Sequence, residues 1–222
     1  MVRIVKSSEE IKCITASLQA TEVAVRKPRD AVRPGLTENE LWSVMHKSVI
    51  EQNGEYVETR LLSAGRQNGL AALDTDVVGC HGYYSDFSFH AGPDPPSDEQ
   101  RELYKAVYVQ VHHNMDMLKP GLTFREYADQ AWDMPEQCWA NRYFLSAHGC
   151  GLTGEYPYLY HLGDVPEAGY DGVIEPGMIL CVESYIGKEG GTQGVKLEQQ
   201  VLVTETGIEL LPKFPFEEAL LK

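Results

Sequence analysis

The feature that most constrains this chain is a set of charged side chains in segments that otherwise read as buried β-structure. Five acids and one histidine lie in or beside short apolar runs or glycine turns: Asp74, Asp76, Asp86, His148, Glu183 and Glu198. An unpaired charge is costly to bury, so carboxylates gathered inside a fold need a cation beside them. Because one imidazole accompanies the acids, the set predicts a pair of hard-to-borderline divalent metal ions.

The composition excludes some classes of partner. The chain has 222 residues, of which 43% are apolar and 23% charged, and its net charge is −14. Nucleic acids and anionic membranes bind clustered Lys and Arg, so neither is expected as a partner. Because no apolar run is long enough for a signal peptide or a bilayer span, we expect a soluble, cytoplasmic protein.

The cysteines are odd in number and have no short paired spacing. They are Cys13, Cys80, Cys138, Cys150 and Cys181. Such a set fits neither a disulfide framework nor a CxxC zinc site. Four of them lie in apolar or aromatic surroundings, which predicts buried free thiols in a reducing compartment.

The predicted elements run in the order helix, helix, strands, and then repeat that order. Polar caps and apolar periodicity indicate helices over residues 7–25, 38–52, 98–118 and from 123 into the 130s. Short strands and glycine turns fill residues 55–89 and most of the chain after 143. No low-complexity linker divides the chain, so we expect one α+β domain over residues 1–222.

Local spacing indicates how the acids could meet. Asp74 and Asp76 are two apart in one run, so a continuous strand would project both from the same face. Asp86 lies on the return strand of a hairpin that turns at residues 79–82, where cross-strand pairing would bring it close to Asp76. Glu198 shares its face of a strand with Lys196 and Gln200.

Taken alone, each residue also has an ordinary structural interpretation. Asp74 could cap a turn, Asp86 could be an exposed acid of a hairpin, and Glu198 could lie on the solvent-exposed face of an edge strand. A single buried histidine such as His148 is more often a hydrogen-bonded structural residue than a ligand. The joint pattern favours the metal site over these separate interpretations.

The joint pattern resembles the superfamily of methionine aminopeptidase, aminopeptidase P, prolidase and creatinase. The hallmark of that superfamily is two aspartates on a hairpin, a histidine in HGxG, and two glutamates, the second in a G-V-x-L-E-like strand. The matching residues, in the same order, are Asp76, Asp86, His148, Glu183 and Glu198. The resemblance covers nearly the whole chain. It implies a pita-bread fold, with pseudo-duplicated αα-β halves around a curved antiparallel sheet, and two divalent ions bound by these residues.

Within the superfamily, the motifs are most similar to those of the metal-dependent dimethylsulfoniopropionate lyases. The similar segments include ETRLLSAGRQN (58–68), DTDVVGCHGYYSD (74–86), YDGVIEPGMILCVESYIG (170–187) and GVKLEQQVL (194–202). This likeness implies that Asp74 is a further metal ligand and that Tyr143 is a substrate-site residue. It also implies iron as the favoured metal, with manganese, cobalt or zinc as alternatives, a small-molecule substrate, and a homodimer.

The chain departs from both patterns at several positions. The peptidases use a histidine seven residues after the ligand histidine, where this chain has Glu155, and another before the hairpin, where no histidine occurs between His46 and Asp74. The lyases place a general-base aspartate where this chain has Gly154. The segment between Asn68 and Leu73 is shorter than in the family, and the family's N-terminal domain is expected to be absent.

Three functions follow as hypotheses. The first is a lyase that eliminates dimethyl sulfide from dimethylsulfoniopropionate, with Glu155 as the first candidate for the general base and Tyr143, a cluster carboxylate or hydroxide as substitutes. The second is an Xaa-Pro-type metallopeptidase or amidohydrolase, in which Glu183 or Glu198 shuttles a proton. The third is a non-catalytic binding protein that keeps the fold.

Overall fold

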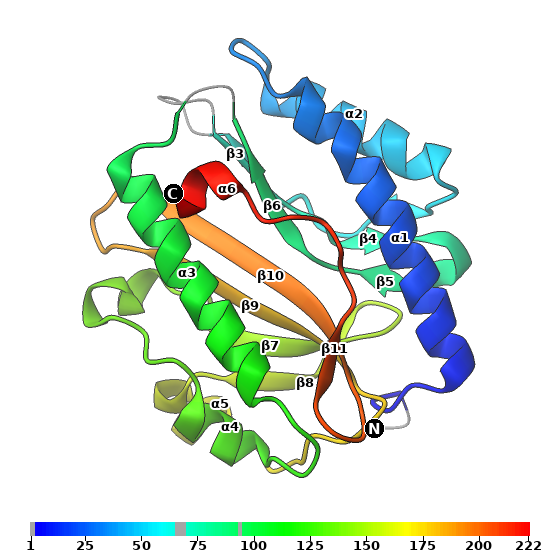
Figure 1. Ribbon diagram of the computed structural model, residues 1–222, viewed down its shortest axis with the longest axis vertical. Helices are drawn as coiled ribbons and strands as arrows, with labels where there is room; N and C mark the ends of the chain where they lie inside the picture. Colours follow the sequence, from blue (N-terminus) through cyan, green and yellow to red (C-terminus); the bar gives the residue numbers. More distant parts are fainter. Residues whose placement is uncertain (1–2, 65–69, 93–94) are drawn as a thin grey trace.

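The computed structural model describes residues 3–64, 70–92 and 95–222 (Figure 1). The N-terminal half contains two helices, α1 (Ser8–Ala31) and α2 (Glu38–Glu51), followed by six short strands. These strands are β1 (Tyr56–Val57), β2 (Leu62–Ala64), β3 (Ala71–Asp74), β4 (Val77–Val78), β5 (Tyr84–Ser85) and β6 (Ser88–Ala91). A 3₁₀ turn at Cys80–Gly82 joins β4 to β5 and confirms the predicted hairpin.

The C-terminal half repeats the order of helices before strands. It contains α3 (Asp98–Met117), α4 (Phe124–Gln130), β7 (Leu145–Cys150), β8 (Gly154–Tyr160), α5 (Val165–Ala168), β9 (Ile179–Gly187), β10 (Gly194–Val203), β11 (Ile208–Leu210) and α6 (Glu218–Leu221). Short 3₁₀ turns lie at Glu136–Asn141 and Leu162–Asp164. Among the described residues, no helix is both long and apolar enough to cross a bilayer.

The long helices begin where capping chemistry dictates. The side chains of Ser7, Thr37, Ser97 and Thr123 each accept a hydrogen bond from the backbone N–H of the third helical residue. The Glu or Gln side chain of that residue in turn accepts one from the backbone N–H of the cap. α1 continues to Ala31, beyond the predicted end near Val25. Val25 and Pro28 are buried there, so packing carries the helix past the point where sequence periodicity fades.

All strand pairs are antiparallel within the described residues. The strands form a five-stranded sheet in the order β11-β10-β9-β7-β8, and two three-stranded sheets, β1-β4-β5 and β2-β3-β6. β6 is joined to β10 at its start, where the Ser88 hydroxyl donates to the Lys196 carbonyl at 3.3 Å. The small sheets therefore adjoin the large one along β10.

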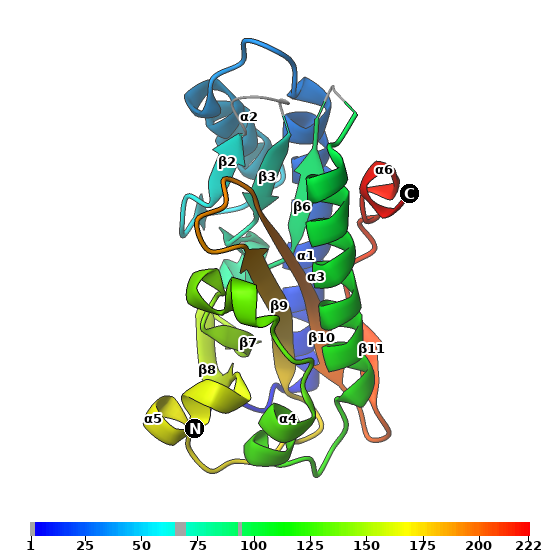
Figure 2. The same ribbon diagram turned by 90° about the vertical axis from the view of Figure 1, so that its left-hand side faces the viewer.

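The two faces of the five-stranded sheet differ in chemistry because side chains alternate along each strand. Leu180, Val182 and Leu197 point toward α3 and join its Val107 and Val111 in the largest apolar cluster. Figure 2 shows α3 lying along this face of β9 and β10. The opposite face carries Cys181, Glu183, Tyr185, Lys196, Glu198 and Gln200. The polar face thus points toward the β3–β6 region, where the aspartates lie.

Candidate metal centre

The three aspartates gather at an interruption in the N-terminal strands. We predicted one continuous strand through Asp74 and Asp76, and this is wrong: β3 ends at Asp74 and β4 begins at Val77. Asp76 has a φ of 40°, a left-handed conformation that aspartate tolerates better than most residues and that a strand cannot contain. The break nevertheless leaves carboxylate oxygens of Asp74, Asp76 and Asp86 within 4.8 Å of one another.

The position of Asp86 follows from the hairpin. Val77 pairs with Ser85, so Asp76 and Asp86 leave the hairpin side by side. The Asp76 amide donates to Asp86 Oδ1 at 3.4 Å, and the Tyr84 hydroxyl donates to Asp76 Oδ1 at 2.6 Å. Tyr84 is a site residue that our sequence analysis missed, since a tyrosine in a short strand carries no distinctive signal.

The two glutamates lie directly opposite each other on neighbouring strands. Glu183 of β9 pairs in register with Glu198 of β10, and both are fully buried. Like charges directly opposite each other destabilise an antiparallel pair. This arrangement therefore requires a cation between the strands and the aspartates.

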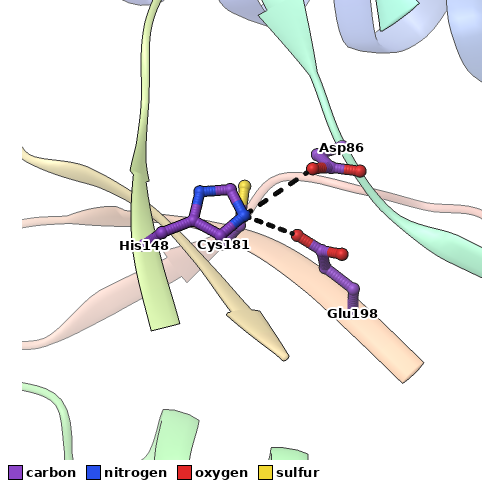
Figure 3. Close-up of side chains that lie close together, drawn as sticks. All are labelled: Asp86, His148, Cys181 and Glu198. Carbon is purple, nitrogen blue, oxygen red and sulfur yellow. Dashed lines mark ion pairs between the residues drawn. The ribbon is translucent and has the colours of Figure 1, made fainter. Parts of the chain in front are cut away.

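His148 completes the set from β7. Its Nδ1 lies 2.9 Å from the Gly149 carbonyl, which can only accept, so Nδ1 carries a proton and Nε2 faces the acids. Nε2 lies 3.3 Å from Glu198 Oε1, 3.6 Å from Glu183 Oε1 and 3.8 Å from Asp86 Oδ2. Figure 3 shows the ring turned toward Asp86 and Glu198, with Cys181 beside it. All six predicted ligands thus come together.

Lys196 places an ammonium group within this cluster. Its Nζ forms an ion pair with Asp74 and lies 2.9 Å from both Glu183 Oε2 and Glu198 Oε2. The alternation along β10 placed Lys196 beside Glu198, but the sequence did not show that its ammonium would turn inward. One ammonium cannot balance five ionised carboxylates, so the buried acids need further cations or must take up protons.

The protonation of the cluster reflects burial in competition with charge. Burial raises the pKa of Asp74 and Asp86 well above the ordinary value, and raises that of Glu183 to about 7. Burial also opposes the charged form of Glu198, but the Lys196 and His148 charges hold its pKa below the ordinary value. Against the effect of burial, Glu198 and Glu183 raise the pKa of His148 to about 10. Without metal ions, the raised pKa values therefore favour the protonated forms of Asp74, Asp86 and His148.

The donor set fits divalent metal ions. Within the described part of the chain, Asp74 Oδ1, Glu183 Oε1 and Glu198 Oε1 accept no hydrogen bond although they are buried. Such orphaned atoms are rare in folded proteins, and three of them around one point indicate a site for cations. Carboxylate oxygens with one imidazole suit iron, manganese, cobalt or zinc. The six residues would hold two such ions, because each of the five carboxylates offers two oxygen donors.

The centre opens into a cavity of about 760 Å³. Asp74 and Lys196 line it together with Ser88, His90 and Tyr185. Tyr143 lies near this opening, since Lys196 Nζ is 5.3 Å from the centre of its ring. His161 bonds the Tyr143 carbonyl through Nε2 at 3.0 Å. His161 therefore holds the backbone of Tyr143 in position.

The structure does not support Glu155 as a general base. Glu155 pairs with Lys6 at 2.9 Å and with Arg3 at 2.7 Å. A β-carbon added to its neighbour Gly154 would lie 3.4 Å from His148 Cε1, so position 154 faces the centre. Adjacent residues of a strand point to opposite faces, so Glu155 points away. The shortened segment at 68–73 lies partly outside the described residues.

The chain is similar in sequence to known proteins of one family. The pattern of metallopeptidase family M24 matches residues 12–205. Dimethylsulfoniopropionate lyase DddP from Roseovarius nubinhibens is 35% identical over 99% of this chain and 54% of its own length. The Xaa-Pro dipeptidase from Pyrococcus furiosus is 26% identical over 96% of this chain and 64% of its own. The chain thus spans about half the length of the lyase it matches.

Solved structures confirm the predicted pita-bread fold. The Xaa-Pro dipeptidase from Bacillus anthracis superimposes with a TM-score of 0.82 at 26% identity, covering 97% of this chain and 64% of that one. The X-Pro aminopeptidase from Thermotoga maritima gives a TM-score of 0.80 at 21% identity, with 96% and 64% covered. The α+β architecture is therefore shared along nearly the whole of this chain.

Proposed function

The chain belongs to metallopeptidase family M24, and from this premise we propose that it is a metal-dependent lyase that cleaves dimethylsulfoniopropionate. The observation that carries the proposal is the third aspartate, because Asp74 joins Asp76 and Asp86 in one cluster. The resemblance to the lyases implies this extra ligand. The 35% identity to proteins named dimethylsulfoniopropionate lyase supports the same choice.

The proposed reaction is a β-elimination. A base removes a proton from the carbon next to the carboxylate, the carbon–sulfur bond breaks, and its electron pair leaves with neutral dimethyl sulfide. Acrylate and the proton are the other products. Two divalent ions in this centre would supply Lewis acidity, which stabilises the negative charge that develops at the substrate carboxylate.

Two residues at the opening suit the anionic end of the substrate. Lys196 carries a positive charge where the cavity meets the cluster. Burial opposes this charge, but the neighbouring acids outweigh it and raise the pKa of Lys196 above its ordinary value. Burial and the Glu183 charge raise the pKa of Tyr143, so its phenol stays protonated. We assign it to donating a hydrogen bond to the substrate and not to accepting a proton.

The proton acceptor is then chosen by elimination. Gly154 has no side chain, Glu155 is held by Lys6, and Tyr143 stays protonated. Of the bases considered from the sequence, a carboxylate of the cluster and a hydroxide remain. The lack of a dedicated base leads us to expect slow turnover.

Headspace analysis tests the proposal. The protein, loaded in turn with Fe²⁺, Mn²⁺, Co²⁺ and Zn²⁺, should release dimethyl sulfide from dimethylsulfoniopropionate, and the Asp76→Ala variant should not. The absence of dimethyl sulfide with all four metals would refute the lyase. A parallel series of Xaa-Pro dipeptides tests the alternative hydrolase, which the 26% identity to an Xaa-Pro dipeptidase favours.

A further inference from the structure

Cys181 lies inside the metal centre, although it is not one of the six ligands predicted from the sequence. It occupies the middle strand β9, opposite His148 on β7 and opposite Gln200 on β10. It lies two residues before Glu183, so both side chains point to the same face of the sheet. The thiol is fully buried, and it is therefore held against the centre and away from solvent.

Cys181 belongs to a group of four side chains whose donor atoms lie close enough together to surround one ion. Donor atoms of Asp86, His148, Cys181 and Glu198 all lie within 4.8 Å of one another (Figure 3). A tetrahedral ion with bonds of about 2.0–2.3 Å requires donors about 3.3–3.7 Å apart. His148 Nε2 lies 3.3 Å from Glu198 Oε1 and 3.8 Å from Asp86 Oδ2, which is close to this spacing, and the Cys181 sulfur lies within 4.8 Å of a donor atom of each of the three.

A second observation points to a ligand at the same place. Glu198 Oε1 and Glu183 Oε1 are fully buried, face this position, and accept no hydrogen bond from the described residues. The thiol of Cys150 contacts that of Cys181 but has two further partners. It accepts a hydrogen bond from Gln200 Nε2 at 2.9 Å and donates to the Tyr84 carbonyl at 3.5 Å.

We propose that Cys181 supplies a sulfur ligand to the ion held by Asp86, His148 and Glu198. Binding forms a sulfur–metal bond, and the thiol proton passes to solvent. The proposal rests on the metal-binding part of the proposed function and is independent of the substrate. Thiolate ligands favour borderline ions, so this half of the centre should prefer Fe²⁺, Co²⁺ or Zn²⁺ to Mg²⁺ or Mn²⁺.

Cobalt substitution tests the sulfur ligand directly. Wild-type protein loaded with Co²⁺ should show an intense thiolate-to-cobalt charge-transfer band in the near ultraviolet. The Cys181→Ser variant should lose this band while it still binds Co²⁺, and the matched Cys150→Ser variant should keep it. A band that persists in Cys181→Ser, or one that is absent from Co²⁺-loaded wild type, would overturn the proposal.

A second measurement needs no variant. X-ray absorption of the Zn²⁺-loaded wild-type protein should show one sulfur neighbour at about 2.3 Å. A shell of nitrogen and oxygen alone would refute the sulfur ligand and leave the metal centre intact. Failure of the protein to retain either ion would instead refute the proposed centre itself, so the two outcomes are distinguishable.

Discussion

Nε2 of His148 lies 3.3 Å from Oε1 of Glu198, although the two residues belong to β7 and β10 and another strand runs between them. The contact spans β9, whose Glu183 and Cys181 lie on the same face. Three strands of one sheet thus supply one side of the centre, and the interrupted β3–β6 region supplies the three aspartates.

Removing one Glu198 oxygen donor should weaken metal binding. In Glu198→Gln the amide is a poorer ligand and cannot balance a dication, so we expect the affinity for Co²⁺ to fall by at least about 10–100-fold, the range seen even for outer-sphere partners. Isothermal titration calorimetry measures this. The exposed Glu205→Gln serves as a control, and equal affinities in the two variants would contradict the assignment.

Lys196 should matter most when no metal is bound. Lys196→Met removes the ammonium that lies between Asp74, Glu183 and Glu198. Breaking a buried pair leaves uncompensated charge, which typically costs about 3–5 kcal/mol of unfolding free energy. Denaturant unfolding in chelator should show this loss, and added divalent metal should reduce it. A metal-free stability equal to that of the exposed Lys213→Met control would contradict this role.

The helix starts, the hairpin and the six clustered residues were all predictable, because capping residues, alternation and short acidic motifs are local signals. The break at Thr75 and Asp76 was not, since a left-handed aspartate has no distinctive pattern. The sequence predicts that Lys196 lies on the same strand face as Glu198 and that Cys181 is a buried thiol, but it does not predict their place in the centre. That place depends on the packing of β7, β9 and β10 against the aspartates, which is tertiary structure.

Position 154 should accept a catalytic carboxylate. A β-carbon there lies in ordinary contact distance of His148, at 3.4 Å from Cε1, so Gly154→Asp places an acid at the edge of the centre. A positioned general base typically contributes about 10²–10⁴-fold, so dimethyl sulfide release should rise above the wild-type rate. Gly207→Asp, at an open position, is the control. An unchanged rate in metal-loaded Gly154→Asp would contradict the elimination mechanism.

The stability of the metal-free protein should fall with rising pH. Burial disfavours the charged ring of His148, but Glu198 and Glu183 outweigh this and raise its pKa from 6.5 to about 10. The raised pKa adds stability that is fully present below pH 6.5 and is lost as the pH rises toward 10. Unfolding in chelator across this range should show the decline, and His148→Gln should flatten it. If the stability of wild type and of His148→Gln fell in parallel with pH, His148 would not be the source of the decline.

The central claim is that the buried acids form a binuclear metal centre, and metal content tests it most directly. After incubation with Fe²⁺ or Co²⁺ and desalting, the wild-type protein should retain about two ions per chain and gain melting temperature. The Asp86→Asn variant, which removes a carboxylate shared by both halves of the cluster, should retain fewer ions. A wild-type protein that retains no ion, and whose melting temperature no divalent metal raises, would contradict the account.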